Sequence, residues 1–179
     1  SLFGLASDAR GLAVSEAHIA AASGRRVHIW STAGRAQRGI DLPQDATAVA
    51  FAGNDRLLVG RGDGMIGEYA LDGRELRSFP GHRGAIVALA TTRGATALVC
   101  GDAKGTVYTW DIASGAGAGS ATVPGLTALA ITADGTGFAT GARDGTVMLW
   151  ARNGRQLGRA MRHRGAVTSL AYSPDGRVI

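Results

Sequence analysis

The chain has 179 residues, of which 45% are hydrophobic and 18% charged, with 28 glycines, four prolines and one cysteine. A single cysteine excludes a disulfide framework and any cysteine-based zinc or iron–sulfur site. The net charge of +5, from 18 arginines and one lysine against 11 aspartates and three glutamates, does not by itself establish nucleic-acid binding.

The balance of residue types favours strands and turns over helices. Lysine and glutamate, which are good helix formers at a surface, are scarce, whereas glycine and alanine are abundant. No apolar run approaches the roughly 20 residues that a membrane helix needs. We therefore expect a turn-rich, mostly β protein that does not enter a membrane, with a cytoplasmic location.

The predicted elements follow a repeat of about forty residues, in which an aromatic residue ends a short β-prone run. The four aromatic residues are Trp30, Tyr69, Trp110 and Trp150, which lie 39, 41 and 40 positions apart. Three of the runs follow a two-residue turn: Asp63-Gly64, Lys104-Gly105 and Asp144-Gly145. Further short runs before and after complete four strands per unit, which is typical of an antiparallel meander.

In chain order, the units are predicted at residues 11–42, 47–80, 85–122 and 126–161, and residues 166–179 begin an incomplete fifth unit. Residues 1–10 are a remnant of a preceding unit or a short interlocking strand. A lone four-stranded sheet cannot bury both of its faces, so successive units must stack face to face. This arrangement predicts the blades of a β-propeller.

The repeat resembles the WD40 family, whose units carry Gly-His near the start and Trp-Asp near the end. Gly81-His82 with Trp110-Asp111 forms one such pair, and the turns at residues 143–147 and 173–176 also match. The resemblance implies an all-β, WD40-type propeller segment of four-stranded antiparallel blades. Rings of this family usually have seven or eight blades, so we expect the ring to be completed by missing sequence or by a second copy.

The family often ties a blade with a buried chain of histidine, serine or threonine, aspartate and tryptophan, and no unit here carries all four. The fourth unit has Thr140, Asp144 and Trp150 without the histidine, and the second has Asp63 with Tyr69. The third has His82 and Trp110, and His163 opens the fifth. We expect His82 to be mostly buried, with its ring bonded to the backbone.

The residues give no reason to propose an enzyme, a cofactor or a metal site. The four histidines lie far apart in the sequence, and Cys100 falls inside a strand, as expected of an unreactive core thiol. The glycine-rich stretch Ser114–Ser120 lacks the ending of a phosphate-binding loop, so we interpret it as a flexible connection between the third and fourth strands.

Most of the net charge is predicted to lie on one face, formed by the turns between second and third strands and by the connections between units. Eight cations face four aspartates there, whereas the opposite face, with Arg56 and Arg93, is neutral. The eight candidate partner-binding residues are Arg25, Arg26, Arg61, Arg83, Lys104, Arg143, Arg162 and Arg164.

The predicted function is a non-catalytic scaffold for protein–protein binding within a larger protein or complex, as the resemblance implies. Arginine pairs in a bidentate way with carboxylates, so the basic face favours an acidic protein segment as partner. A plain solvated face is the other interpretation of these charges. The alternative function is a ligand- or nucleic-acid-sensing module attached to an effector domain outside this chain, although nucleic acid would require more exposed aromatic residues.

Overall fold

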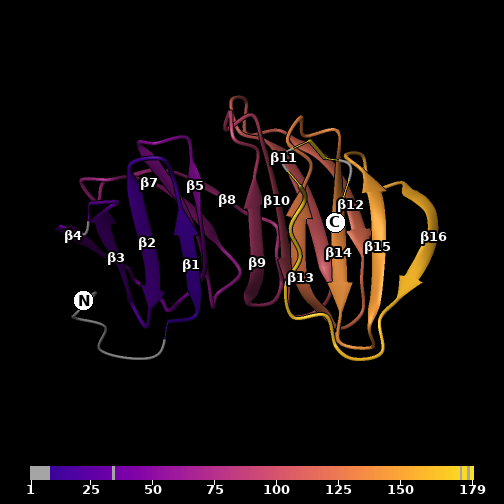
Figure 1. Ribbon diagram of the computed structural model, residues 1–179. Helices are drawn as coiled ribbons and strands as arrows, with labels where there is room; N and C mark the ends of the chain where they lie inside the picture. Colours follow the sequence, from indigo (N-terminus) through magenta and orange to yellow (C-terminus); the bar gives the residue numbers. More distant parts are fainter. Residues whose placement is uncertain (1–8, 34, 174, 177) are drawn as a thin grey trace. The chain divides into compact units, whose positions relative to one another are not determined.

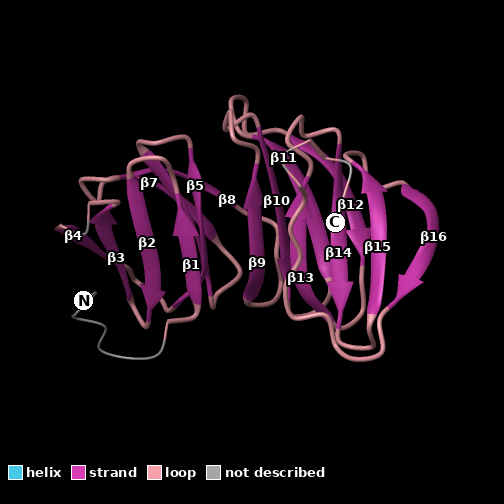
Figure 2. Ribbon diagram, in the orientation of Figure 1, coloured by secondary structure: helices cyan, strands magenta, loops and turns pink. Residues whose placement is uncertain are grey.

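The computed structural model describes residues 9–33, 35–173, 175–176 and 178–179, and these residues form strands and turns (Figures 1 and 2). The strands make four antiparallel sheets of four strands each, and within each sheet neighbours in sequence are neighbours in space. The described part of the chain contains no helix long and apolar enough to cross a membrane. The chain divides into two compact units, Ser1–Ile86 and Val87–Ile179.

Unit 1 contains the first two sheets, which we call blades 1 and 2. The strands of blade 1 are β1 (Gly11–Val14), β2 (His18–Ser23), β3 (Arg26–Ser31) and β4 (Ala36–Asp41). The strands of blade 2 are β5 (Ala46–Ala52), β6 (Arg56–Arg61), β7 (Ile66–Ala70) and β8 (Glu75–Phe79). Residues 1–8 of the predicted N-terminal remnant lie outside the described residues.

Unit 2 contains blades 3 and 4, and its first strand begins at the boundary between the units. The strands of blade 3 are β9 (Ile86–Thr91), β10 (Ala97–Asp102), β11 (Thr106–Asp111) and β12 (Gly117–Thr122). The strands of blade 4 are β13 (Leu126–Ile131), β14 (Gly137–Ala142), β15 (Thr146–Ala151) and β16 (Gln156–Arg162). The chain is therefore all-β, as the composition predicts.

The four repeated aromatic residues occupy equivalent places on the third strands. Each lies opposite a residue of the second strand of its own sheet: Trp30 opposite Ile19, Tyr69 opposite Leu57, Trp110 opposite Leu98, and Trp150 opposite Phe138. The third strand is flanked on both sides by paired strands, so its side chains stand above and below a complete sheet.

Each unit has its core between its two sheets, where alternate residues of neighbouring blades meet. In unit 1 the core includes Ile29, Phe51 and Leu57. In unit 2 it includes Leu126 and Phe138, whose ring stacks on Trp150 with centroids 6.0 Å apart. Burial of each such side chain contributes about 1.5–3 kcal/mol, and the alternation fixes the register of every strand.

Glycines in the second strands let the blades approach closely. A Cβ atom on Gly101 would lie 2.1 Å from Leu126 Cδ2, and one on Gly141 would lie 2.4 Å from Val167 Cγ1. In unit 1, a Cβ atom on Gly60 would likewise clash with the side chain of Ile86. A branched or long apolar side chain from the following segment thus fills the space that glycine leaves.

The turns between second and third strands also depend on glycine. Gly64, Gly105 and Gly145 have φ values of 85°, 84° and 83°, which favour glycine strongly. A Cβ at these positions would lie only 2.7, 2.4 and 2.3 Å from the carbonyl oxygen of a residue in the connection that follows each blade. The two-residue turns of the sequence therefore determine how the turn and the connection pack.

One sequence-based expectation about local structure is wrong. The glycine-rich stretch is only partly a connection, because Gly117–Thr122 forms β12 and pairs with β11. Gly119 allows this strand to lie against blade 4, since a Cβ there would be 2.3 Å from the Asn153 carbonyl carbon. Residues 166–170, at the start of the predicted incomplete fifth unit, belong to none of the four sheets of the described residues.

Candidate protein-interaction surface

In unit 2 the turns and connections on one side are joined to one another by backbone hydrogen bonds. The Val123 amide donates to the Gly105 carbonyl at 2.7 Å, and the Arg143 amide donates to the Gly125 carbonyl at 2.8 Å. The His163 amide then donates to the Gly145 carbonyl at 2.8 Å. The turn after β10, the turn after β14 and the connections after β12 and β16 therefore follow one another along a single side of the unit.

Three exposed cations lie along this series of turns: Lys104, Arg143 and Arg164, which we call the basic row. None of the three makes an ion pair with another described residue. The nearby carboxylate of Asp102 is fully buried, and its Oδ1 accepts the amides of Lys104 at 3.0 Å and Thr106 at 2.9 Å. The three cations therefore face solvent, whereas the Asp102 carboxylate stabilises the turn through its hydrogen bonds.

The fourth cation of this side, Arg162, is paired. Its Nη1 lies 3.1 Å from Asp144 Oδ2, and both side chains are exposed. Asp144 also accepts the Thr146 amide at 2.9 Å and the Thr146 hydroxyl at 2.8 Å. These Thr146 bonds, with a smaller contribution from Arg162, lower the pKa of Asp144 below its ordinary value. Asp144 thus stabilises the turn and compensates one cation.

In unit 1 the predicted cations have different surroundings. Arg25 is exposed and donates to the carbonyls of Leu42 and Pro43, and Arg26 pairs with Asp41 at 2.8 Å. Arg83 is exposed on the connection after β8. Of the cations predicted for this face in unit 1, Arg25 and Arg83 are thus exposed without an ion pair to a described side chain.

Arg61 contradicts the prediction of an exposed rim, because only 7% of its surface is accessible. Its guanidinium donates to the Tyr69 hydroxyl at 3.4 Å and pairs with Asp63 at 3.3 Å. Tyr69 has a hydroxyl where the other blades have an indole, and this oxygen gives a buried cation a partner. Arg61 is therefore a structural residue of blade 2.

The family's buried hydrogen-bond chain is present in part. The Trp150 indole donates to Thr140 Oγ1 at 2.9 Å inside blade 4. His82 is half-buried on the connection after β8, and His163 is exposed, with Nδ1 lying 3.2 Å from the Gly165 carbonyl oxygen. Burial raises the pKa of the Cys100 thiol to about 12, as expected of an unreactive core residue.

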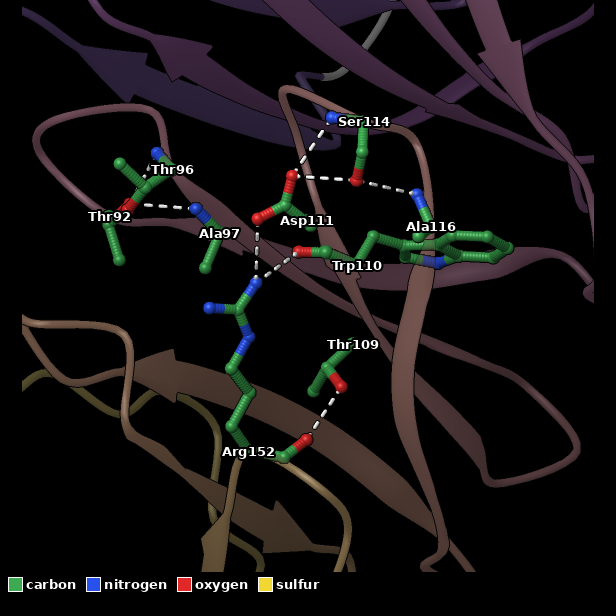
Figure 3. Close-up of polar contacts among 9 residues, drawn as sticks. All are labelled: Thr92, Thr96, Ala97, Thr109, Trp110, Asp111, Ser114, Ala116 and Arg152. Carbon is green, nitrogen blue, oxygen red and sulfur yellow. Dashed lines mark hydrogen bonds and ion pairs between the residues drawn. The ribbon is translucent and has the colours of Figure 1, made fainter.

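On the opposite side of unit 2, a polar cluster joins blades 3 and 4 (Figure 3). The Arg152 guanidinium lies 3.4 Å from Asp111 Oδ2 and donates to the Trp110 carbonyl at 3.5 Å, while Thr109 Oγ1 donates to the Arg152 carbonyl at 2.7 Å. Asp111 Oδ1 accepts both the amide and the hydroxyl of Ser114. These groups bond to one another, so the cluster serves to fix the two blades.

Sequence reasoning missed the most buried charge in unit 1. Glu68 on β7 is 1% exposed and pairs with Arg56 at 2.7 Å and with Arg77 at closer range. Arg56 was predicted to lie on a neutral exposed face, yet it is held by this carboxylate. The only signal in the sequence is a glutamate at an inward position of a third strand, with arginines on the two neighbouring strands. No group of three potential metal ligands occurs among the described residues.

Comparisons with known proteins agree with this geometry. The family described as "WD domain, G-beta repeat" matches residues 73–111, 119–151 and 154–179, which together are more than half of the chain. Actin-interacting protein 1-2 of Arabidopsis thaliana is 45% identical over 53 residues, which are 28% of this chain and 9% of that protein.

A chain in a structure titled "Crystal Structure of Mitotic Checkpoint Complex" matches with a TM-score of 0.82 and 23% identity. The match covers 96% of this chain and 58% of that one, and at this identity it shows the fold alone. This chain thus spans little of the curated relative and somewhat more than half of the structural neighbour. Together with the four-stranded sheets, the family match means that the chain belongs to the WD40-repeat family.

Proposed function

We propose that this chain is a non-catalytic scaffold that binds an acidic segment of another protein through the basic row of unit 2. Proteins of the WD40 family generally serve as protein-interaction scaffolds. The similar proteins are an actin-interacting protein and a chain of a mitotic checkpoint complex, which supports a protein as partner. The observation that carries the proposal is the exposure of Lys104, Arg143 and Arg164 without carboxylate partners among the described residues.

The physical argument concerns both geometry and electrostatics. Backbone hydrogen bonds fix the turns that present the three cations, so little conformational entropy is lost when a partner binds them. Arginine offers two parallel donors to a carboxylate, and exposed charges accelerate encounter more than they increase affinity. The basic row is therefore suited to steer and orient an acidic segment, with additional contacts supplying the rest of the affinity.

The test compares charge reversal on the two sides of unit 2. The double variant Lys104→Glu and Arg143→Glu reverses two of the three charges of the row. Arg93→Glu with Arg155→Glu changes the net charge equally on the opposite turns, where both arginines are exposed. The probe is a fluorescein-labelled peptide of alternating glutamate and glycine, and stopped-flow fluorescence measures its association rate. We expect a loss of about tenfold for the first pair and less than about twofold for the second at low salt.

The dependence of the association rate on salt, and binding of a second probe, provide two further tests. The rate for the unmodified chain falls as the ionic strength rises from about 0.05 to about 0.3 M, because the Debye length shortens. Equal losses in both double variants would show that only net charge matters, which would overturn the proposal. Tighter binding of a DNA oligonucleotide than of the acidic peptide, with the same dependence on the row, would assign the surface to nucleic acid instead.

A further inference from the structure

Lys104 is the only lysine among the 179 residues, which include 18 arginines. The arginine guanidinium stays protonated at every physiological pH, whereas a lysine amine becomes a nucleophile once it has lost a proton. Acylation, which converts an ammonium into a neutral amide, is a reaction of lysine and not of arginine. The amine chemistry of the side chains is thus confined to one position, and that position belongs to the basic row.

The turn of blade 3 releases Lys104 from a structural role. The equivalent residues of blades 2 and 4 are Asp63 and Asp144, which also precede the glycine of the turn. Each of these carboxylates accepts the backbone amide two residues further on, at 3.0 and 2.9 Å. In blade 3 the buried carboxylate of Asp102 accepts the corresponding Thr106 amide, at 2.9 Å. A change in the Lys104 side chain therefore leaves the bonds of the turn intact.

The ammonium of Lys104 is accessible to a small molecule. The residue is exposed, and its two neighbours in the chain, Ala103 and Gly105, are small. Its side chain makes no ion pair with another described residue. The Asp102 carboxylate, two residues earlier, is fully buried and bonded to backbone amides. A donor can therefore approach the nitrogen from solvent.

A second cation of the basic row lies on the adjacent turn. A Cβ atom on Gly105 would lie 3.3 Å from Pro124 Cα. One on Gly125 would lie 3.6 Å from Arg143 Cβ. Pro124 and Gly125 are consecutive and exposed, and neither carries a charge. Lys104 and Arg143 thus flank one short uncharged connection, so the charge of Arg143 raises the concentration of small anions near the amine.

We propose that Lys104 is an acylation site that reacts with an anionic acyl donor, either an acyl phosphate or a thioester of an anionic carrier such as coenzyme A. The ammonium first gives one proton to solvent. The amine then attacks the acyl carbon and forms a C–N bond, while the bond to the phosphate oxygen or the thioester sulfur breaks with its electron pair. The leaving phosphate or thiolate takes up the second proton.

Acylation also regulates the basic row, because the neutral amide leaves the row with two charges in place of three. An acidic segment should therefore associate more slowly with the acylated chain. This consequence rests on the proposed function, whereas the reaction at Lys104 does not.

The first experiment measures acetylation of the 179-residue chain at low salt by acetyl phosphate and, in a separate arm, by acetyl-coenzyme A. Peptide mass spectrometry follows the rate at Lys104. The matched control relocates the lysine: Lys104→Arg with Arg93→Lys keeps the net charge and places the amine on an exposed turn of the opposite side. We expect Lys104 to react about fivefold faster than the relocated lysine, because the basic row concentrates the donor. The donor with the larger preference is the one that the site favours.

Two further measurements separate attraction of the donor from simple exposure of the amine. N-hydroxysuccinimidyl acetate is uncharged, so it should modify Lys104 and the relocated lysine at rates within about twofold. Arg143→Gln should slow the reaction of Lys104 with acetyl phosphate about threefold. Arg155→Gln, on an exposed turn of the opposite side, is the control and should change this rate by less than about 1.5-fold.

The second experiment measures binding with the fluorescein-labelled acidic peptide that probes the basic row. The acetylated chain should associate with this peptide about threefold more slowly than the untreated chain at low salt. Lys104→Arg, given the same treatment, should keep the association rate that it had before treatment, because it has no lysine to acylate. This comparison also accounts for acetylation of the N-terminal amine.

Each result decides a part of the proposal. Equal rates for Lys104 and the relocated lysine with both anionic donors would overturn the acylation site, as would an equal preference for Lys104 with the uncharged ester. An unchanged association rate after acetylation of a chain that binds the peptide would overturn the regulation. If the untreated chain does not bind the peptide, the proposed function fails, and the acetylation rates still decide whether Lys104 is the site.

Discussion

Blades 2 and 4 hold the same aromatic position by different chemistry. In blade 4 the Trp150 indole donates one short hydrogen bond to Thr140, and Phe138 stacks on the indole ring. In blade 2 the Tyr69 hydroxyl lies between the Arg61 guanidinium and the Glu75 carboxylate, at 3.4 Å from each. One blade is thus fixed by neutral groups and the other by charged groups.

The features common to both blades are the glycines of the turns and second strands. Gly64 and Gly145 have nearly the same φ and the same close approach to a carbonyl, and Gly60 and Gly141 both receive an apolar side chain. These contacts depend on the absence of a side chain at the glycine. The comparison suggests that the positions of these glycines determine the backbone geometry of a blade. Different side-chain networks can then stabilise the same geometry.

The largest expected effect is that of Glu68→Ala, which tests the buried charge cluster of blade 2. This change leaves Arg56 and Arg77 without their buried carboxylate, which costs about 3–5 kcal/mol for a fully buried pair. Because about a third of each arginine side chain is exposed, these side chains can turn to water, and we expect a loss of about 3 kcal/mol. Urea unfolding followed by circular dichroism measures it.

The control for this prediction is Asp41→Ala in the same unit. Asp41 pairs with Arg26 at 2.8 Å, but both side chains are exposed, so the loss should be below about 0.5 kcal/mol. Similar losses for Glu68→Ala and Asp41→Ala would mean that burial of the charge cluster contributes nothing to the stability of blade 2.

The second prediction concerns what the two blades share. Gly64→Ala and Gly145→Ala should each lower the free energy of unfolding by about 2 kcal/mol, because alanine is strained at these φ values and its Cβ meets a carbonyl oxygen. Urea unfolding measures both variants, and for Gly145→Ala alkylation of Cys100 by iodoacetamide is a second measurement, since this buried thiol of unit 2 reacts when the unit opens.

Gly62→Ala and Gly165→Ala are the matched controls in the two units. Neither glycine has a positive φ, and an added Cβ would meet only the Asp45 carbonyl oxygen, at 3.9 Å from Gly62. Both changes should alter stability by less than about 0.5 kcal/mol. A loss at Gly145 without one at Gly64 would show that the turn contact is particular to blade 4.

The third prediction separates the two aromatic contacts. Thr140→Val removes the hydroxyl that accepts from the buried Trp150 indole and should cost about 1–2 kcal/mol. Tyr69→Phe should cost about 0.5 kcal/mol, since both of its bonds are long and Arg61 keeps Asp63 as a partner. The two variants are compared by thermal unfolding, and a larger loss for Tyr69→Phe would reverse the assignment of strong and weak contacts.

The features that the sequence predicted well are local. Aromatic spacing and the two-residue turns before Tyr69, Trp110 and Trp150 determine the strand order, because each turn is formed by neighbouring residues with a glycine at the required position. β12 was missed because its glycines and small residues have no strand signal of their own. Its pairing is decided by its contact with blade 4 through Gly119.

Charged residues were predicted less well, because burial depends on strands that meet across the sheet. Arg61 lies beside a turn, which predicts exposure. Its side chain is nevertheless buried, because it donates a hydrogen bond to the Tyr69 hydroxyl eight positions later. Glu68 is paired with arginines from the two neighbouring strands, Arg56 twelve positions before it and Arg77 nine positions after it. Of the cations predicted for the basic face of unit 2, Lys104, Arg143 and Arg164 are exposed without an ion pair to a described residue.

The last and smallest expected effect concerns acid pH and the turn of blade 4. Hydrogen bonds from Thr146 and the charge of Arg162 lower the pKa of Asp144 in the folded chain below its unfolded value of 3.8. The unfolded state therefore binds its proton first, so this contribution to stability is present above about pH 4 and is lost as the pH falls further through the folded pKa. Thr146→Val removes the largest cause and should raise the pKa of Asp144 more than Arg162→Ala does, as measured by carboxyl NMR titration. A larger rise for Arg162→Ala would show that the exposed ion pair, and not the turn, sets the pKa of this carboxylate.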